Sequence, residues 1–161
     1  MRPSSLASCF VRVPRRGLAL LALSLAIGMG ATAEDEALAE GPAEFRVIVH
    51  PSSPLRSADR GLVADAFLKK VTRWGNGEPI RPVDLHADNR ARRRFSEAVL
   101  KRSVGAVRSY WQQRIFSGRD VPPPELESDE SVIAFVGKYE GAIGYVSAGA
   151  KLLGVRELSI E

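Results

Sequence analysis

The sequence predicts an α/β domain in which helices flank a central, mostly parallel sheet. Two short apolar segments, 45–50 and 80–86, are rich in β-branched residues and bounded by turn-forming residues, as is typical of buried strands. Between them, residues 57–70 have apolar side chains at the spacing of an amphipathic helix. A strand, a helix and a strand in this order form a βαβ unit, so we expect a right-handed crossover and two parallel strands.

Local geometry in this unit depends on a few residues. Ser57 is the predicted N-cap of the helix, with Asp59 in its first turn. Pro82 lacks the N–H group that a central strand needs, so the second strand is expected to lie at a sheet edge or to start there. The helix side expected to be buried consists of Leu62, Val63, Ala66 and Phe67.

The rest of the chain predicts three more helices and two more strands. Asn89, Ser103 and Ser128 each precede a segment with helical spacing and are predicted N-caps. Trp111 and Ile115 are among the residues expected on the buried side of the second of these helices. The expected elements are helices over 90–102, 103–115 and 128–141 and strands over 142–146 and 155–160.

The first 33 residues have the pattern of a signal peptide. Arg12, Arg15 and Arg16 precede an apolar stretch at 17–30, which is too short to span a bilayer comfortably, and a small-x-small cleavage pattern follows. General secretion and twin-arginine export both stay open. The mature protein is therefore expected in the periplasm, without a membrane span. The predicted boundaries are a signal peptide at 1–33, a flexible leader at 34–44 and a folded domain at 45–161.

The charge balance argues against a nucleic-acid partner. The chain has 23 basic and 19 acidic residues, and removal of the four signal-peptide arginines leaves 19 of each. A neutral, exported protein lacks the general basic character of nucleic-acid binders. The segment from Arg46 to Arg119 has 16 basic and 6 acidic residues. Two interpretations stay open: this positive charge attracts small anions, or the acidic segments on either side balance it in the fold.

Catalytic and metal-binding patterns are absent from the sequence. Cys9 lies in the predicted signal, so the mature protein has no thiol or disulfide. His50 and His86 have no third ligand at metal-site spacing, and no Ser-His-Asp order, phosphate-binding P-loop or dinucleotide-binding glycine pattern occurs. We therefore expect a protein that is not an enzyme and holds no metal or cofactor.

Four segments resemble one protein family in their order and spacing. They are "VIVHP" at 47–51, "AFLKK" at 66–70 followed by Trp74, "IRPV" at 80–83 and "GAIGY" at 141–145. Together they resemble the periplasmic-binding-protein-like domain of phosphate-type ABC transporter solute-binding proteins. The resemblance implies a single periplasmic-binding-protein-like lobe and a loop before the 90–102 helix that contacts phosphate.

Two features depart from the family's pattern. Full members have two lobes and bind their ligand in the cleft between them, whereas 128 mature residues suffice for one domain. The family's phosphate binders have an Asp-Gly-Ser-Gly-Thr-like run in the contact loop, where this chain has Asp88-Asn89-Arg90-Ala91-Arg92. The glycine that allows close backbone approach and the hydroxyl donors are both absent.

The expected parallel strands predict a ligand site at their carboxyl ends. Ligands gather there in open α/β sheets, close to helix N-termini. The predicted strands end at histidines, and the loops after them offer hydroxyl, amide and guanidinium groups. The candidate ligand-binding residues are His50, Ser52, Ser53, His86, Asn89 and Arg90. The alternative is that Asn89 is only a helix cap and that the two serines only form a turn.

Four arginines begin the helix that follows Asn89. We expect Arg90 to be the one that meets an anion. Because Arg92, Arg93 and Arg94 spread over about 200° of a helix, they cannot all face one ligand. We expect them to be mostly solvated or paired with acidic residues, for which the region 129–130 is a candidate.

Two functions stay open from the sequence. The first is an exported substrate-binding-protein-like domain that binds phosphate or a similar small oxyanion for transport or sensing, with an envelope transporter as partner. The second is a degenerate relative that lost the ligand and serves as a protein-interaction module in the cell envelope. The missing glycine and hydroxyls favour the second, and Asn89 and Arg90 favour the first.

Overall fold

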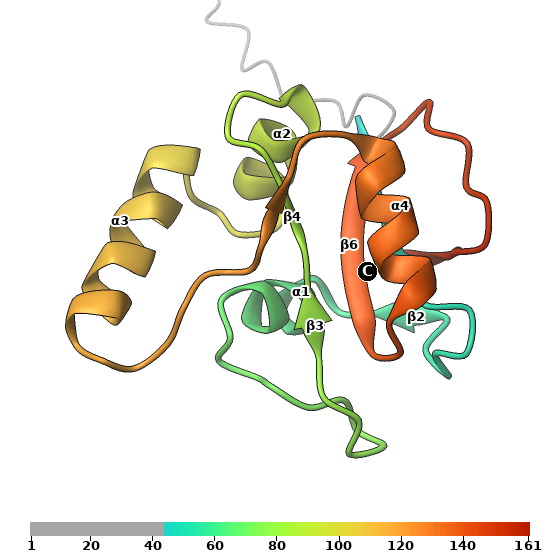
Figure 1. Ribbon diagram of the computed structural model, residues 1–161, viewed down its shortest axis with the longest axis horizontal. Coiled ribbons are helices and arrows are strands. Elements are labelled where there is room, and N and C mark those ends of the chain that lie inside the picture. The colour runs from blue at the N-terminus through green and yellow to red at the C-terminus, as the bar shows by residue number, and fades with distance from the viewer. Residues whose placement is uncertain (1–43) are drawn as a thin grey trace, which may run out of the picture. The chain divides into compact units, whose positions relative to one another are not determined.

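The structure is a computed structural model that describes residues 44–161. The predicted signal peptide and all of the predicted leader except Glu44 lie outside these residues and stay predictions. The elements (Figure 1) are β1 (Phe45–Val49), β2 (Ser57–Ala58), α1 (Arg60–Phe67), β3 (Arg81–Pro82), β4 (Asp84–Leu85), α2 (Arg90–Ala98), α3 (Val104–Phe116), β5 (Glu125–Leu126), α4 (Asp129–Lys138), β6 (Ala142–Ser147) and β7 (Arg156–Ile160).

Strands and helices alternate around a central sheet, which confirms the α/β class. Five strands pair in the order β2-β7-β1-β6-β3, and β4 and β5 form a separate two-stranded sheet. The five-stranded sheet is mixed, because β1 runs antiparallel to both β6 and β7, whereas the β2–β7 and β3–β6 pairs are parallel. The strands are therefore less uniformly parallel than the sequence suggested.

The predicted βαβ unit is wrong in its strand pairing. β6 lies between β1 and β3 and runs antiparallel to the first and parallel to the second, so β1 and β3 point in opposite directions. The cause is long-range: β6 is buried along nearly its whole length and inserts between β1 and β3, although it comes some sixty residues after β3. As Pro82 indicated, β3 lies at the sheet edge.

Helix caps follow the sequence with one exception. Asn89, Ser103 and Ser128 cap α2, α3 and α4, as predicted. Asp59, and not Ser57, caps α1: its Oδ1 accepts from the Gly61 N–H at 2.7 Å. Ser57 belongs to β2 and pairs with β7, so the helix begins later than its pattern indicated.

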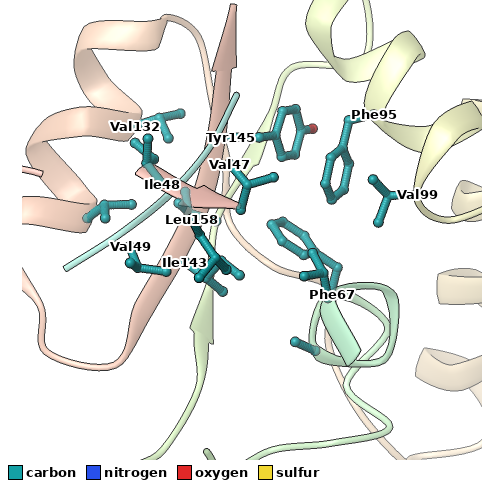
Figure 2. Packing of buried hydrophobic residues seen from close by; sticks show 14 of the residues in the cluster. Val47, Ile48, Val49, Phe67, Phe95, Val99, Val132, Ile143, Tyr145 and Leu158 are labelled. Carbon is teal, nitrogen blue, oxygen red and sulfur yellow. The ribbon is translucent and has the colours of Figure 1, made fainter. Parts of the chain in front are cut away.

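The two faces of β6 pack against different layers. On one face, the rings of Tyr145, Phe95 and Phe67 lie together (Figure 2), with Tyr145 stacked on Phe95 at a centroid separation of 3.9 Å. On the other face, a Cβ built on Gly144 would lie 2.7 Å from a methyl of Val132, which belongs to α4. Glycine at 144 thus lets α4 approach β6 closely, and one continuous core links both helical layers to the sheet.

α3 departs from the predicted burial at its C-terminal end. Val107 and Trp111 are buried as expected and face α2, the main packing neighbour of α3. Ile115, expected on the buried side, is 50% exposed, and Phe116 next to it is 90% exposed. In Figure 1, α3 stands beside α2, away from the five-stranded sheet. The apolar side chains at the end of α3 are therefore largely in contact with solvent.

Candidate functional site

The start of α2 is fixed by hydrogen bonds of the loop before it. The Asn89 side chain accepts from the Ala91 N–H at 2.8 Å, and the Asn89 N–H donates to the His86 carbonyl at 3.0 Å. His86 is itself tied to β5, because its N–H donates to the Leu126 carbonyl at 2.9 Å. These bonds place Arg90 at the first helical position with its side chain free to reach outward.

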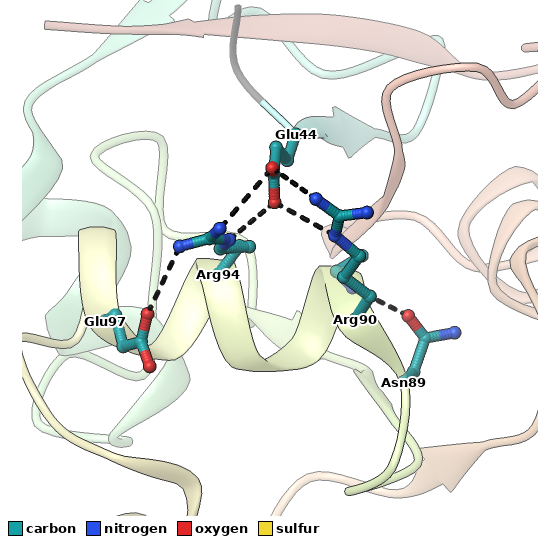
Figure 3. A network of polar contacts seen from close by, with 6 residues as sticks. Glu44, Asn89, Arg90, Arg94 and Glu97 are labelled. Atoms are coloured by element: carbon teal, nitrogen blue, oxygen red, sulfur yellow. Dashed lines mark hydrogen bonds and ion pairs between the residues drawn. The ribbon is translucent and has the colours of Figure 1, made fainter. Parts of the chain in front are cut away.

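Arg90 and Arg94 converge on the carboxylate of Glu44 (Figure 3). Arg90 donates from Nη2 to Oε1 at 2.7 Å and from Nε to Oε2 at 3.3 Å. Arg94 donates from Nε to Oε2 at 2.5 Å and from Nη2 to Oε1 at 3.5 Å. Both carboxylate oxygens are therefore held by both guanidinium groups, and we call these two residues the arginine clamp.

The arginine clamp changes the acidity of the group that it holds. The Arg90 hydrogen bond, followed by that of Arg94, lowers the pKa of the Glu44 carboxyl below its ordinary value. The three side chains are partly exposed to solvent: 72% for Arg90, 51% for Arg94 and 34% for Glu44. The clamp is thus a solvent-accessible pair of positive charges that holds the Glu44 carboxylate.

Arg92 is buried and not solvated, and it pairs with an acidic residue, as one of the two expected alternatives had it. Its side chain is 3% exposed and forms an ion pair with Asp84, which is also buried. Tyr145 completes the group: its hydroxyl donates to Asp84 and accepts from Arg92 Nη1 at 3.3 Å. Residue 92 lies about 200° around the helix from 90, so it points into the protein while the arginine clamp points out.

Tyr145 stays neutral in this buried group. Burial raises the pKa of its phenol, although the charge of Arg92 opposes the shift. The neutral hydroxyl can therefore donate to Asp84 while it accepts from the Leu85 N–H at 3.3 Å. We refer to Asp84, Arg92 and Tyr145 as the buried triad. It links β4, α2 and β6.

The remaining arginine of the run has a local role. Arg93 is exposed, as expected, and donates to the Asp88 carbonyl at 2.8 Å. Asp129, from the region expected to pair with these arginines, instead accepts a hydrogen bond from the Ser147 N–H at 3.1 Å. Besides Glu44, Arg94 has Glu97 as an ion-pair partner at 3.9 Å.

The other three predicted site residues form a separate group after β1. The imidazole Nδ1 of His50 lies 2.6 Å from the Ser52 hydroxyl, and the Ser53 N–H donates to the His50 carbonyl at 2.9 Å. Arg156, from β7, donates to the carbonyls of Ser53 and, at 2.6 Å, of Leu55. These contacts hold a turn together, in agreement with the alternative stated for the serines.

The structure does not bring the six predicted residues together. Glu44, which the arginine clamp holds, precedes β1, whereas His50 follows it. Six strand steps of roughly 3.3 Å separate Glu44 from His50 by about 20 Å. His86, Asn89 and Arg90 therefore lie at one end of β1, and His50, Ser52 and Ser53 at the other. The parallel pairing that would have brought both loops to one edge of the sheet is not present, and ligand contact by these residues stays a prediction.

Sequence reasoning missed two members of the site, Arg94 and Glu44. The spacing of Arg90 and Arg94 by four residues was a usable signal, since such residues are neighbours on a helix surface. Glu44 lies 46 positions before Arg90, and nothing local indicates that contact.

The described residues offer no other obvious chemistry at this end. His86 Nδ1 lies 3.6 Å from an oxygen of Asp88, and both side chains are exposed. Among residues 44–161, no three His, Cys, Asp or Glu side chains are grouped so that they could hold a metal ion. None of the helices in that range is both long and apolar enough to cross a membrane.

Comparison with known proteins identifies the fold. No family model and no curated protein sequence matches the chain. Solved structures do match. An ABC-type phosphate transport receptor from Vibrio cholerae superposes with a TM-score of 0.56 at 16% identity, over 73% of this chain and 46% of the receptor. PstS from Borrelia burgdorferi gives a TM-score of 0.56 at 12% identity, over 73% of this chain and 47% of PstS.

A third structure, that of a phosphate ABC transporter substrate-binding protein from Clostridium perfringens with bound phosphate, gives a TM-score of 0.55 at 20% identity. This chain has the fold of a periplasmic-binding-protein-like lobe. The match covers 73% of this chain and 44% of the Clostridium protein, so the chain spans under half the length of the structures that it resembles.

Proposed function

We propose that this protein is an exported, non-enzymatic binding domain that holds phosphate or a similar small oxyanion at the arginine clamp, for transport or sensing in the periplasm. The observation behind the proposal is that Arg90 and Arg94 together hold both oxygens of one carboxylate. Guanidinium forks match carboxylate and phosphate oxygens in the same bidentate manner.

The position of the arginine clamp supports the proposal. Arg90 opens α2, a helix of 9 residues, so the first-turn N–H groups add partial positive charge beside its guanidinium. Asn89, as cap, and His86, through its carbonyl, hold the preceding loop in place. A transporter in the envelope is the proposed partner, by analogy with the phosphate transport receptors of the same fold.

Calorimetric titration of the mature protein with phosphate and with sulfate, at low ionic strength, tests the proposal. Arg90→Ala/Arg94→Ala should abolish the heat of binding. The matched control is Arg108→Ala/Arg119→Ala, which removes the same charge from exposed positions elsewhere and should bind as the wild type does. No heat from the wild type with either anion up to about 10 mM, or equal affinity in all three proteins, would contradict the proposal.

Ligand contact by His50, Ser52 and Ser53 stays a separate prediction. Their group lies about 20 Å from Glu44 along β1, which argues against one small oxyanion shared with Arg90. If they contribute, Ser52→Ala/Ser53→Ala should weaken anion binding in the same titration. An unchanged affinity would leave them with the turn-forming role that their hydrogen bonds indicate.

A second function is favoured by the end of α3. Ile115, Phe116 and Val121 are large apolar side chains that lie within seven residues and are 50%, 90% and 63% exposed. Apolar groups gathered in this way mark interaction surfaces. The alternative is therefore a protein-interaction module of the envelope. Periplasmic crosslinking tests it: a partner that is retained in Arg90→Ala/Arg94→Ala and lost in Phe116→Ser favours this function over anion binding.

A further inference from the structure

We infer that Glu44 is a built-in competitor that occupies the arginine clamp until an external oxyanion displaces it. The inference rests on the proposed function and adds regulation to the same site. The clamp is filled by a carboxylate of the chain itself, so an incoming anion meets an occupied site. The affinity of the protein for the anion then depends on how much more strongly the arginine clamp binds the anion than it binds Glu44.

The geometry makes the two ligands mutually exclusive. Four guanidinium nitrogens, two from each arginine, lie between 2.5 and 3.5 Å from the two oxygens of Glu44 (Figure 3). A bidentate oxyanion needs the same nitrogens in the same place. Among the other arginines of the run, Arg92 is committed to Asp84 and Arg93 to a backbone carbonyl. Among the arginines that begin α2, only Arg90 and Arg94 therefore remain for the incoming anion.

The backbone holds Glu44 at the site while its side chain can leave. The Glu44 carbonyl accepts from the Ala148 N–H at 3.3 Å, and Phe45 directly after it pairs with Ser147 and packs edge-on against Phe95 with ring centroids 5.5 Å apart. The carboxylate is 34% exposed, so a rotation about its side-chain bonds places it in water. Displacement needs no change in the sheet.

A tethered carboxylate is an effective competitor despite weak contacts. Tethering through a short link gives an effective concentration on the order of millimolar. Exposed ion pairs are individually weak, because water and salt screen them. We therefore expect removal of the Glu44 charge to tighten oxyanion binding by about 2- to 10-fold. That range is large enough to measure and small enough for a micromolar ligand to overcome the competitor.

Titration of three forms of the mature protein with sulfate tests the inference. The variant is Glu44→Gln, which keeps the side-chain length and removes the charge. The control is Glu140→Gln, an exposed residue beyond α4 that changes the net charge equally. We expect the Kd for sulfate to fall by about 2- to 10-fold in Glu44→Gln and to stay at the wild-type value in Glu140→Gln.

The outcomes separate this inference from the proposed function. Tighter binding by Glu44→Gln than by the wild type and Glu140→Gln supports both. Wild type and Glu44→Gln with equal Kd values would overturn the competitor while the anion site stands. Equal tightening in Glu44→Gln and Glu140→Gln would also overturn it, because net charge then explains the gain. Absence of binding in all three proteins would remove the anion site and the competitor together.

Discussion

Two arginine–carboxylate contacts on the same helix differ in almost every physical respect. In the buried triad, the side chains of Arg92 and Asp84 are 3% and 4% exposed. In the arginine clamp, on the opposite side of α2, Arg90 and Arg94 are more than half exposed. Both contacts pair arginine with a carboxylate, and Arg92 lies two residues from Arg90 and from Arg94 along α2.

The difference separates a structural role from the proposed binding role. Two charges that have left water depend on one another, because removing either leaves a buried charge without compensation. Two charges at the surface exchange their partner for water at little cost. The buried triad therefore fixes α2 on β4 and β6, whereas the arginine clamp can change its ligand without changing the fold.

The largest predicted loss of stability comes from a substitution that breaks the buried triad. Arg92→Ala should lower the free energy of unfolding by about 3–5 kcal/mol, since Asp84 is left charged and buried. Urea denaturation measures the change. Arg93→Ala, the exposed neighbour, is the matched control and should stay within about 0.5 kcal/mol of the wild type. A loss below about 1 kcal/mol in Arg92→Ala would mean that water reaches Asp84.

A smaller loss is expected from Tyr145→Phe. The change keeps the ring that stacks on Phe95 and removes only the hydroxyl that bonds to Asp84, Arg92 and the Leu85 N–H. The free energy of unfolding should fall by about 1–3 kcal/mol, because the partners lose a buried hydrogen bond. An effect as large as that of Arg92→Ala would show that the hydroxyl and not the ion pair dominates the triad.

The arginine clamp should respond in the opposite way. Arg90→Ala/Arg94→Ala should leave the urea midpoint close to that of the wild type, because both side chains are exposed. The same variant should weaken sulfate binding by at least about tenfold, since charge-assisted bidentate contacts are lost. A large loss of stability together with weak binding would contradict the separation of roles.

The smallest predicted effect is on pH dependence. The pKa of Glu44 is lowered in the folded protein, so its contribution to stability is present above its unfolded pKa and is lost as the pH falls through the folded value, below about 4.5. Wild type and Glu44→Gln should therefore differ slightly in stability at pH 7, and the difference should shrink as the pH falls below about 4.5. A difference that grows toward low pH would have the wrong sign for this ion pair.

Local patterns predicted the elements better than their arrangement. The caps at Asn89, Ser103 and Ser128 and the strands β1, β6 and β7 follow from short stretches of sequence, because capping and apolar runs act within a few residues. The position of β6 between β1 and β3 depends on pairing between distant segments. That order has no local signature, and the parallel βαβ unit failed for this reason.

The same limit applies to the candidate site. Asn89 and Arg90 were identified because a cap and a first-turn arginine are visible in the sequence. The burial of Arg92 was not, since it depends on Asp84 and Tyr145 reaching the same point from β4 and β6. The partner of the arginine clamp, Glu44, likewise comes from another part of the chain.

The edges of the five-stranded sheet restrict how another protein can join this one. β2 and β3, the two outer strands, are only two residues long each, and β3 contains Pro82, which has no N–H to offer. Edge strands of this kind give an incoming strand almost no ladder to extend, which protects natural sheets from edge-to-edge aggregation. A partner protein must therefore recognise side chains on the helices and loops, and not backbone groups along the sheet.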